Sequence, residues 1–569
     1  MTEDPLKRLK ETIKPNRPTF SFKTVSEARV LKIIRKLSNK NSFGTDGISS
    51  KVLKSAADVL AAPITFIINT SLTSGVYPTR WKTAKVIPIL KKGDRSAMSN
   101  YRPIALLPVA SKILEEVVRS QVSDHFEKNG LLPECQHGFR PSRSTTSALL
   151  SLEKKLIEAH ENKTSSAMLL FDLSAAFDTL DHRIFLEKLR VYGVDDLGQR
   201  WFKSYLENRQ QFVELGQARS SIKSVPWGSP QGAVCSPLIF TIFVADMPLW
   251  ITYMELFGFA DDTTGVVSHS DIDEACRLAE TDAESIMSFM SSNYLVTNKD
   301  KTKFLSFVPS RNEDYCPREI TIGGNNIIET SCEKVLGLYI SNDLSWANHI
   351  QHTKASLRYK TCMLRRLARS MPEEHLRQLA DGLILSKIRY GLSVYGGIVR
   401  TTEDDPIDGM IHSLEVTVND VMRITERVSL KDHVPIQDLR RRTNIPSVNQ
   451  MTAQTIITDA WKATHGGLPG LENTLVELDR SGIETRAKAN GNVNVPSGSR
   501  ILRKSFSHQG AVLWNALPKD INPILCQALG YAEYIRGEQI HPRTLAVNTA
   551  FILQGIQFFC PLNKYFILS

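Results

Sequence analysis

The most informative segment of this chain is Leu256-Phe257-Gly258-Phe259-Ala260-Asp261-Asp262-Thr263-Thr264-Gly265. Apolar, β-prone residues lead up to two adjacent carboxylates, and a second β-prone run, residues 263–267, leaves them. This pattern predicts a β-hairpin with the acids at its tip. Two negative charges at one turn repel each other unless cations lie between them, although Asp is also an ordinary residue of solvated turns. Alone, the ten residues favour the solvated turn, and the rest of the chain shifts that balance.

Length and composition indicate which class of protein this chain belongs to. The chain has 569 residues, too many for one hydrophobic core, so several subdomains are expected. Lys and Arg number 70 against 60 Asp and Glu, and this net charge of +10 favours a polyanionic partner. The 8 cysteines form no Cys-x-x-Cys pair, which predicts reduced thiols, no zinc site and an intracellular protein, in either nucleus or cytoplasm. The most apolar window, residues 237–260, carries two acids and two prolines, so no membrane span is expected.

A third carboxylate follows another apolar run upstream. Residues 166–172 read as a buried strand that ends in Asp172, where a charge must be paired, hydrogen-bonded or bound to metal. A helix-prone segment, residues 182–189, comes next. With the later hairpin this predicts a split βαβ unit in which Asp172 and the Asp261-Asp262 tip lie on adjacent central strands. Carboxylates so placed could hold two Mg²⁺ ions roughly 3.5–4 Å apart for phosphoryl transfer.

Basic residues precede this unit on a predicted hairpin. Residues 81–90 predict a strand, residues 91–94 a turn, and residues 100–104 the returning strand. Such a hairpin could hold Lys85 and Arg102 near one another, and an Arg fork with a Lys point charge suits a triphosphate. A solvated basic hairpin is the alternative and is slightly favoured when the hairpin is considered alone.

Two loops can each be interpreted in two ways, as ligand-binding or as purely structural segments. The basic, Ser/Thr-rich loop of residues 136–146 either follows a nucleic-acid backbone or caps the helix that begins near Thr145. Residues 227–238 form a Gly/Pro turn into a long apolar helix. Glycine in this turn allows close approach to a ligand, whereas without a ligand the segment is a loop and a core helix.

Several helices are also expected. Residues 24–27, Thr-Val-Ser-Glu, match a capping box and predict a helix with an apolar face of Val30, Ile33, Ile34 and Leu37. Further helices are predicted over residues 374–392 and 447–464.

Five motifs in this order resemble the reverse transcriptase domain of LINE-type (non-LTR, jockey-like) retrotransposons. They are Asn100-Tyr101-Arg102-Pro103-Ile104, Gln136-His137-Gly138-Phe139-Arg140, Phe171-Asp172 with Ala176-Phe177-Asp178, Ser229-Pro230-Gln231-Gly232 with Ser236-Pro237-Leu238, and Phe259-Ala260-Asp261-Asp262. The resemblance covers roughly residues 20–520. It implies an RNA-directed DNA polymerase that adds dNTPs to a DNA primer on a template RNA.

The resemblance also implies the architecture, an α+β right-hand polymerase with fingers, a split βαβ palm, a helical thumb and a helical C-terminal region. The expected parts are residues 1–165 for the N-terminal helices and fingers, 166–310 for the palm, 311–400 for the primer-grip strands and thumb, 401–525 for the C-terminal region, and 526–569 for a tail of unknown role.

The family's functional residues map onto this chain one by one. Asp172, Asp261 and Asp262 would be the catalytic carboxylates that bind two Mg²⁺ ions, which Mn²⁺ could replace. Phe177, five residues past Asp172, lies where the family keeps the aromatic gate that excludes a ribose 2′-OH.

Other matches concern the nucleotide. Arg102 matches the triphosphate-binding arginine, and Lys85 is assigned as a second phosphate contact. Gln231 and Gly232 match the segment that contacts the incoming nucleotide and the template. Lys301 matches a lysine near the leaving pyrophosphate, where it either donates a proton or belongs to an exposed basic turn.

A basic helix is expected after residues 335–346, which resemble the primer-grip strands. On a helix over residues 349–370, four basic residues fall within about 60° of one another, and four apolar residues occupy the other side. The basic residues are Lys354, Arg358, Arg365 and Arg369, and the apolar ones are Leu357, Met363, Leu364 and Leu367. Such a stripe either follows the template–primer backbone or is a solvated helix face.

Intact elements of this family usually carry an endonuclease ahead of the polymerase. This chain begins almost at the fingers, which predicts a truncated copy that would depend on an endonuclease acting in trans. Two other functions stay open: an element-derived nucleic-acid-binding protein without activity, and a group II intron-type maturase. The three acids count against the first, and the motif spelling and the missing maturase-type tail count against the second. No oligomeric state is predicted.

Overall fold

The computed structural model describes residues 4–14, 17–91, 93–174, 176–297, 301–309, 316–397, 409–464, 467–468, 471, 474 and 493–516, without the side chains of some residues near 172–176. The chain divides into two compact units. The first contains Met1–Ser144, Ala167–Phe304 and Asp314–Glu329, and the second contains Thr145–Ser166, Leu305–Glu313 and Thr330–Ser569.

The first unit opens with helices. They are α1 (Lys7–Thr12), α2 (Glu27–Lys36), α3 (Ser50–Ser55), α4 (Ala57–Ser74) and α5 (Val109–Lys128). Val30, Ile33 and Ile34 of α2 are buried, as the apolar face predicts. The predicted capping box was wrong, because Ser26 accepts the capping hydrogen bond from the Arg29 amide and Glu27 is already the first helical residue.

A five-stranded sheet follows these helices. It contains β1 (Thr83–Leu90), β2 (Tyr101–Leu106), β4 (Arg209–Leu215), β5 (Ala218–Arg219) and β6 (Lys223–Val225), with short 3₁₀ turns η1 (Thr79–Trp81) and η2 (Met98–Asn100). The order is β2-β1-β4-β5, and β6 also pairs with β4. The predicted hairpin of β1 and β2 is antiparallel, whereas β1 and β4 are parallel.

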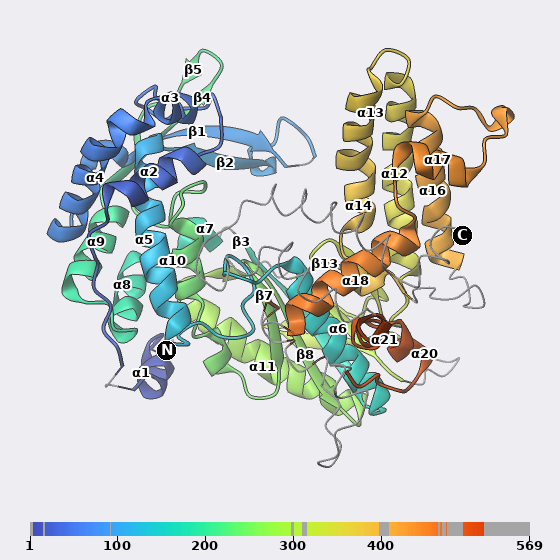
Figure 1. Ribbon diagram of the computed structural model, residues 1–569. Coiled ribbons are helices and arrows are strands. Elements are labelled where there is room, and N and C mark those ends of the chain that lie inside the picture. The colour runs from blue at the N-terminus through green and yellow to red at the C-terminus, as the bar shows by residue number, and fades with distance from the viewer. Residues whose placement is uncertain are drawn as a thin grey trace, which may run out of the picture. The chain divides into compact units, whose positions relative to one another are not determined.

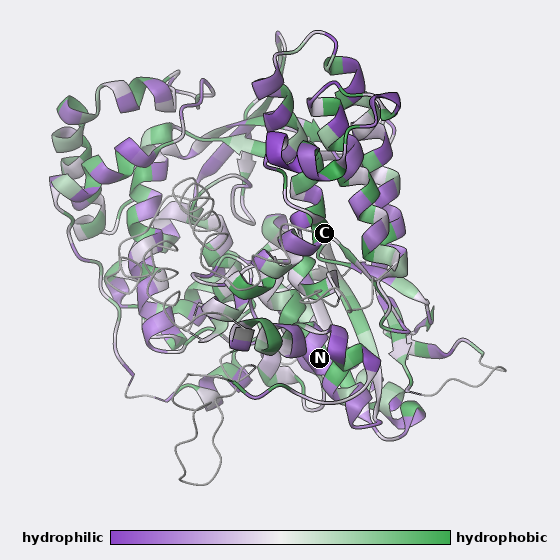
Figure 2. Cartoon of the chain, turned by 45° about the vertical axis from the view of Figure 1, so that its right-hand side comes forward, coloured by the Kyte–Doolittle hydropathy of each residue, from purple (hydrophilic) through white to green (hydrophobic). Residues whose placement is uncertain are grey.

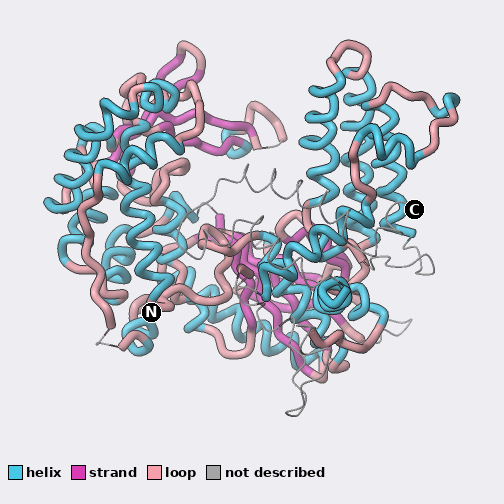
Figure 3. The backbone as a smooth tube through the Cα atoms, viewed as in Figure 1, coloured by secondary structure: helices cyan, strands magenta, loops and turns pink. Residues whose placement is uncertain are grey.

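A second five-stranded sheet carries the acidic motifs (Figures 1 and 3). It contains β3 (Ser165–Ser174), β7 (Glu255–Phe259), β8 (Asp262–His269), β9 (Val296–Thr297) and β10 (Lys303–Phe307). The order is β10-β3-β8-β7, and β9 also pairs with β3. The strand of Asp172 is therefore hydrogen-bonded to the strand of Asp262, which confirms that the two acidic motifs lie on adjacent strands.

The first unit contains further helices, one of which, α11 (Ile272–Ser292), packs against β8 of this sheet. The others described are α7 (Ala176–Thr179), α8 (His182–Val191), α9 (Asp196–Leu206), α10 (Ser236–Phe243) and η3 (Met247–Trp250), and the hairpin β11 (Glu319–Ile322) and β12 (Asn325–Ile328) packs on α11. Residues 237–260 form a buried helix and then a strand, as predicted. None of the described helices combines the length and the apolarity needed to cross a membrane.

The second unit is mostly helical within the described residues. Its elements are α6 (Thr145–Glu161), β13 (Cys332–Val335), β14 (Leu338–Ser341), α12 (Ala347–Leu367), α13 (Glu373–Ala380), η5 (Asp381–Leu385), α14 (Ser386–Arg389), α15 (Leu392–Tyr395), α16 (Gly409–Thr425), η6 (Leu430–Asp432), α17 (Ile436–Thr443), α18 (Val448–Thr464), α20 (Arg500–Lys504) and α21 (Phe506–Ala516). Figure 2 shows hydrophilic and hydrophobic residues alternating along the helices. The single helix predicted over residues 374–392 is interrupted, because η5 is a π-helical segment that contains Gly382, a poor helix former.

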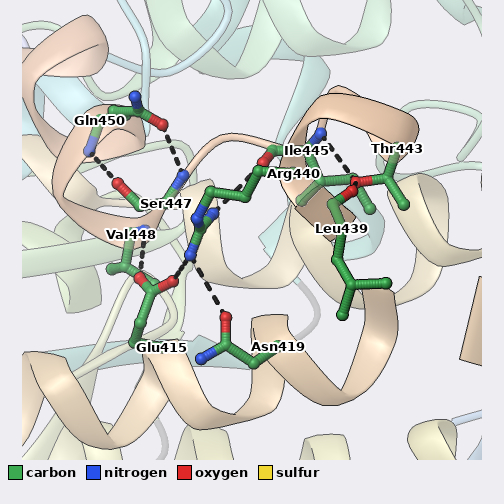
Figure 4. A network of polar contacts seen from close by, with 9 residues as sticks. All are labelled: Glu415, Asn419, Leu439, Arg440, Thr443, Ile445, Ser447, Val448 and Gln450. Carbon is green, nitrogen blue, oxygen red and sulfur yellow. Dashed lines mark hydrogen bonds and ion pairs between the residues drawn. The ribbon is translucent and has the colours of Figure 1, made fainter. Parts of the chain in front are cut away.

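An ion pair joins three helices of this unit (Figure 4). The guanidinium of Arg440 on α17 contacts the carboxylate of Glu415 on α16 and donates to the Ile445 carbonyl at 3.2 Å. Glu415 also accepts from the amide of Val448, at the start of α18, at 2.6 Å. Because the Arg440 and Glu415 side chains are only 16% and 17% exposed, the loss of one partner leaves the other as an unpaired and poorly solvated charge.

Arg440→Ala should therefore lower the free energy of unfolding of the second unit by about 2 to 3 kcal/mol. The matched control is Arg441→Ala, because Arg441 is 71% exposed and its one ion pair within the described residues is with Asp438, at 3.3 Å. A surface pair of that kind contributes less than about 1 kcal/mol. Urea unfolding of the two variants checks the difference, and equal losses would contradict the role given to the Arg440–Glu415 pair.

Candidate active site

The acidic turn is built by a tight hairpin. Phe259 pairs with Asp262, so only Ala260 and Asp261 form the loop between β7 and β8. Ala260 has φ 59°, and two-residue hairpin loops favour such positive φ angles. Asp261 lies in the turn and is partly buried, whereas Asp262 is exposed and is already the first residue of β8.

The donor chemistry of this turn suits a hard divalent cation. Asp261 and Asp262 offer carboxylate oxygens, which Mg²⁺ prefers. The backbone of Asp172 belongs to β3, beside β8, but its side chain lies outside the described residues. Among the side chains that are described, no three His, Cys, Asp or Glu residues gather as a candidate cation site. The two aspartates of the turn thus fit such an ion, and the predicted triad depends on Asp172 for its third member.

A loop from far upstream supports the turn. Gln136 forms a parallel bridge with Gly258 of β7, and the His137 amide donates to the Gly258 carbonyl at 2.7 Å. The side-chain oxygen of Gln136 accepts from the amide of Ala260 at 3.1 Å. This role is neither of the two interpretations that the sequence left open for the loop, and sequence reasoning missed it.

The arginines of that loop are held within the protein. Arg140 is only 8% exposed and forms a two-pronged contact with the Glu127 carboxylate, at 2.9 and 2.7 Å. Arg143 pairs with Glu134. Burial, with the charges of these two arginines, lowers the pKa of His137 to about 4, so its imidazole is neutral at pH 7. These contacts organise the loop and give no support to the idea that Arg140 and Arg143 follow a nucleic-acid backbone.

The predicted gate and nucleotide segment are hydrogen-bonded to each other. The amide of Ser229 donates to the Phe177 carbonyl at 2.7 Å, and the side-chain amide of Gln231 donates to the Asp178 carboxylate at 2.6 Å. The ring of Phe177 lies 4.8 Å from that of Phe240 on α10. The structure therefore brings together Phe177 and Gln231, which lie 54 residues apart in the printed sequence.

The same segment is joined to the β1–β2 hairpin. The amide of Ala105 on β2 donates to the Gln231 carbonyl at 2.8 Å. Gly232 has φ 112°, and a Cβ atom there would lie 2.9 Å from the Ala105 carbonyl oxygen. Glycine is required at this position, because both the backbone angle and the close approach exclude a side chain. The predicted nucleotide segment thus packs against the strand that carries Arg102.

A buried carboxylate fixes the end of this segment. Glu115 of α5 accepts from the amides of Val234 and Cys235, at 2.7 and 3.1 Å, where α10 begins. Burial raises the pKa of Glu115, and these hydrogen bonds together with the nearby Arg209 guanidinium act in the opposite direction. The turn before α10 is consequently anchored at both of its ends.

Lys85 and Arg102 lie on one face of the hairpin but not side by side. Lys85 pairs with Leu106 and Arg102 with Ile89, four residues further along β1, which is about 13 Å. The ammonium of Lys85 is 3.1 Å from the Glu214 carboxylate, and its side chain is 13% exposed. Arg102, by contrast, is exposed. Lys85 is therefore already engaged by a neighbouring strand.

Lys91 is a better neighbour for Arg102. Its amide donates to the Asn100 carbonyl at 2.8 Å, so the strand pairing continues through it. Alternation along β1 puts Lys91 on the face of Arg102. Burial raises the pKa of Asp178, whereas the hydrogen bond from Gln231 and the positive charge of Lys91 act in the opposite direction. The sequence analysis placed Lys91 in the turn after the strand, and β1 does end at Leu90, but Lys91 was not considered as a neighbour of Arg102.

The remaining predicted residues lie elsewhere. Lys301 is described and exposed, but Asn298, Lys299 and Asp300 of its motif are outside the described residues. In the second unit, Lys354, Arg358 and Arg365 lie on α12, whereas Arg369 lies beyond its end.

The predicted apolar face of α12 was partly wrong. Leu357 and Leu364 are buried and Leu367 is partly buried, but Met363 is 40% exposed. The helix instead buries His349, Ile350, Thr353 and Thr361, because α12 packs against both α16 and β14.

Comparison with known proteins identifies the domain. Residues 89–340 match the family described as reverse transcriptase (RNA-dependent DNA polymerase), so this chain carries a reverse transcriptase domain. The match contains Arg102, the gate, the nucleotide segment, all three aspartates and Lys301, whereas Lys85 and α12 lie outside it.

The relatives of the chain come from mobile elements. It is 26% identical over 393 residues to "RNA-directed DNA polymerase from mobile element jockey" of Drosophila melanogaster, covering 67% of this chain and 42% of that protein. It is 26% identical over 388 residues to the jockey protein of Drosophila funebris, covering 66% and 42%. It is 27% identical over 360 residues to "Probable RNA-directed DNA polymerase from transposon BS" of Drosophila melanogaster, covering 60% and 38%. The matched region thus spans about two fifths of these relatives.

Gly228→Ala should separate the gate from the nucleotide segment. Gly228 has φ 72°, and a Cβ atom there would lie 2.6 Å from the carbonyl oxygens of both Phe177 and Asp178. Gly216→Ala is the matched control, because Gly216 has φ 60° and nothing within 4 Å of its Cβ position. Both variants carry the backbone strain, so Gly228→Ala should lower the free energy of unfolding by about 2 kcal/mol more. Urea unfolding measures both, and equal losses would argue against the tight packing.

Proposed function

We propose that this chain is an RNA-directed DNA polymerase of a non-LTR retrotransposon, which extends the 3′-OH of a DNA primer with dNTPs on an RNA template. The observation that carries the proposal is the reverse transcriptase match over residues 89–340, which includes a hairpin with two adjacent aspartates next to the strand of a third. The relatives named above are RNA-directed DNA polymerases of mobile elements, or probable ones.

In this proposal Asp172, Asp261 and Asp262 hold two divalent cations, Mg²⁺ or in its place Mn²⁺. Such ions, when bound, stabilise the attacking and leaving oxygens of an in-line phosphoryl transfer. The protein contributes rigidity, because β8 is paired on both sides, with β3 and β7. Fixed carboxylates need little reorganisation during the reaction.

The incoming dNTP would lie over the β1–β2 hairpin and the segment that packs against it. Arg102 offers a planar fork of donors to the triphosphate, and Lys91 adds a point charge on the same face. Gln231 and Gly232 would contact the nucleotide and template, and Phe177, backed by Phe240, would reject a ribose 2′-OH. Lys301 is proposed to approach the leaving pyrophosphate.

Nucleic acid would be held by charge. Lys354, Arg358, Arg365 and Arg369 are proposed to follow the template–primer backbone, and binding would weaken as salt rises. Arg365 already has a weak neighbour, the Asp420 carboxylate at 4.0 Å, which a phosphate could displace.

Asp261→Asn should reduce primer extension at least about 1,000-fold, because the neutral amide no longer holds a cation. The assay extends oligo(dT) on poly(rA) with dTTP and Mg²⁺, and the same duplex is used to measure binding. Binding should stay within about two-fold, because the substitution leaves the basic helix α12 intact. Equal extension by the variant would exclude the site. Salt-sensitive binding without extension by the unaltered chain would instead indicate an element-derived nucleic-acid-binding protein.

Lys91→Met should raise the KM for dTTP in this assay by about ten-fold, or ~1.4 kcal/mol, because one positive charge beside the triphosphate is lost. Lys85→Met is the matched control. It removes the same charge from the same face of β1, but from a side chain already paired with Glu214. The KM of Lys85→Met should change less than about two-fold. The reverse order of effects would restore Lys85 as the phosphate contact.

A further inference from the structure

The catalytic turn contains a residue in an unfavourable backbone conformation. Ala260 has φ 59°, and a left-handed conformation is costly for residues other than glycine. The turn also carries Asp261, whose direction follows from the backbone of its neighbour. Some other part of the protein must therefore hold Ala260 in place.

Gln136 makes the contacts that do so. Its side chain is only 5% exposed, and its Oε1 atom accepts from the Ala260 amide at 3.1 Å and from the Gly138 amide at 2.8 Å. Its Nε2 atom points to the Ala260 carbonyl at 3.5 Å. The side-chain amide of Gln136 thus contacts both the backbone N–H and the backbone carbonyl of Ala260. These two contacts hold Ala260 at its positive φ angle.

The loop that carries Gln136 is itself fixed against the hairpin. The amide of Gly258 donates to the Cys135 carbonyl at 2.8 Å. A Cβ atom at Gly138 would lie 2.2 Å from the Ala260 nitrogen, so the backbone of the loop packs directly against the backbone of the turn. On the other side, Arg140 donates to the Gln136 carbonyl at 3.2 Å and is paired with Glu127. The loop that carries the Gln136 side chain is therefore held in place on both sides.

We propose that Gln136 is a positioning residue for the catalytic carboxylates: it fixes the backbone of Ala260 and thereby the direction of Asp261. The proposal rests on the proposed polymerase function for its catalytic consequence, but the fixing of the turn is a property of the free protein. In this role Gln136 acts through Ala260, with which its side chain makes its contacts.

Gln136→Met tests this role, because methionine fills a similar volume and offers no comparable acceptor to the two amides. The chain provides a close control in Gln121, whose side chain also binds the backbone of one distant residue. Its Oε1 atom accepts from the Lys23 amide and its Nε2 atom donates to the Lys23 carbonyl, both at 2.8 Å. Gln121→Met removes the same kind of contact at a place outside the catalytic hairpin and its supporting loop.

Three measurements are made on the full chain, the first two without nucleic acid and the third with bound oligo(dT)–poly(rA). Hydrogen exchange should become at least about ten-fold faster for residues 255–267 in Gln136→Met, because the Ala260 amide loses its acceptor. Mn²⁺ binding, followed by electron paramagnetic resonance, should weaken by about ten-fold. The Mg²⁺ concentration for half-maximal extension should rise similarly, while duplex binding stays constant. Gln121→Met should match the unaltered chain in all three.

Rescue separates positioning from a loss of folding. Ala260→Gly removes the cost of positive φ, so in the double variant it should recover a large part of the Mn²⁺ affinity lost in Gln136→Met. Gln136→Glu keeps the oxygen acceptor, folds if Gln136→Met does not, and should keep slow exchange over residues 255–267.

Unchanged exchange and Mn²⁺ affinity in Gln136→Met would overturn the inference, as would fast exchange in Gln136→Glu or strictly additive effects of the two substitutions. Failure of the polymerase proposal has a different signature. In that case the unaltered chain fails to extend the primer, while the exchange and Mn²⁺ measurements still decide the role of Gln136.

Discussion

The pairing of β8 with two neighbours is the constraint on which the rest of the site depends. β8 lies between β3 and β7, and its first residue, Asp262, pairs with Phe259 of β7. A carboxylate on a central strand moves little, whereas one on a free loop would need ordering at each encounter with substrate. The short turn completes this arrangement, because a two-residue loop leaves Asp261 almost no freedom of direction.

Backbone contacts, more than side chains, bring the remaining parts to this point. Ser229 bonds to Phe177, Ala105 bonds to Gln231, and His137 bonds to Gly258 through main-chain groups. Glycines lie where these chains approach closely, at positions 138, 228 and 232. The motifs, which are separated in the sequence, are thus joined by main-chain hydrogen bonds into one framework. Their side chains are not needed for these contacts and can contact ligands.

The sequence predicted those structural elements that depend on local residue patterns. Two β-prone runs on either side of adjacent carboxylates predicted the β7–β8 hairpin, and the apolar strand before Asp172 predicted its neighbour. It could not predict which amide Gln136 would bind, because that contact joins residues 124 positions apart. Lys85 looked free because its partner, Glu214, is on a strand that pairs in parallel after a long excursion of the chain. Met363 looked buried because helical periodicity gives a face but not its partners. The π-helical segment at residues 381–385 likewise has no signature beyond Gly382.

The long reach of the Gln136 contact has a consequence for synthesis on the ribosome. At about 5–20 residues per second, roughly 6–25 s pass between the appearance of Gln136 and that of Ala260, which lies 124 residues later. During that interval the loop has Gly138 and the Arg140–Glu127 pair, but the β7–β8 hairpin that it contacts has not been made. The contact can form only after β7 and β8 have emerged, so the candidate active site is completed late in translation, and chains that end before β8 leave the loop without its partner.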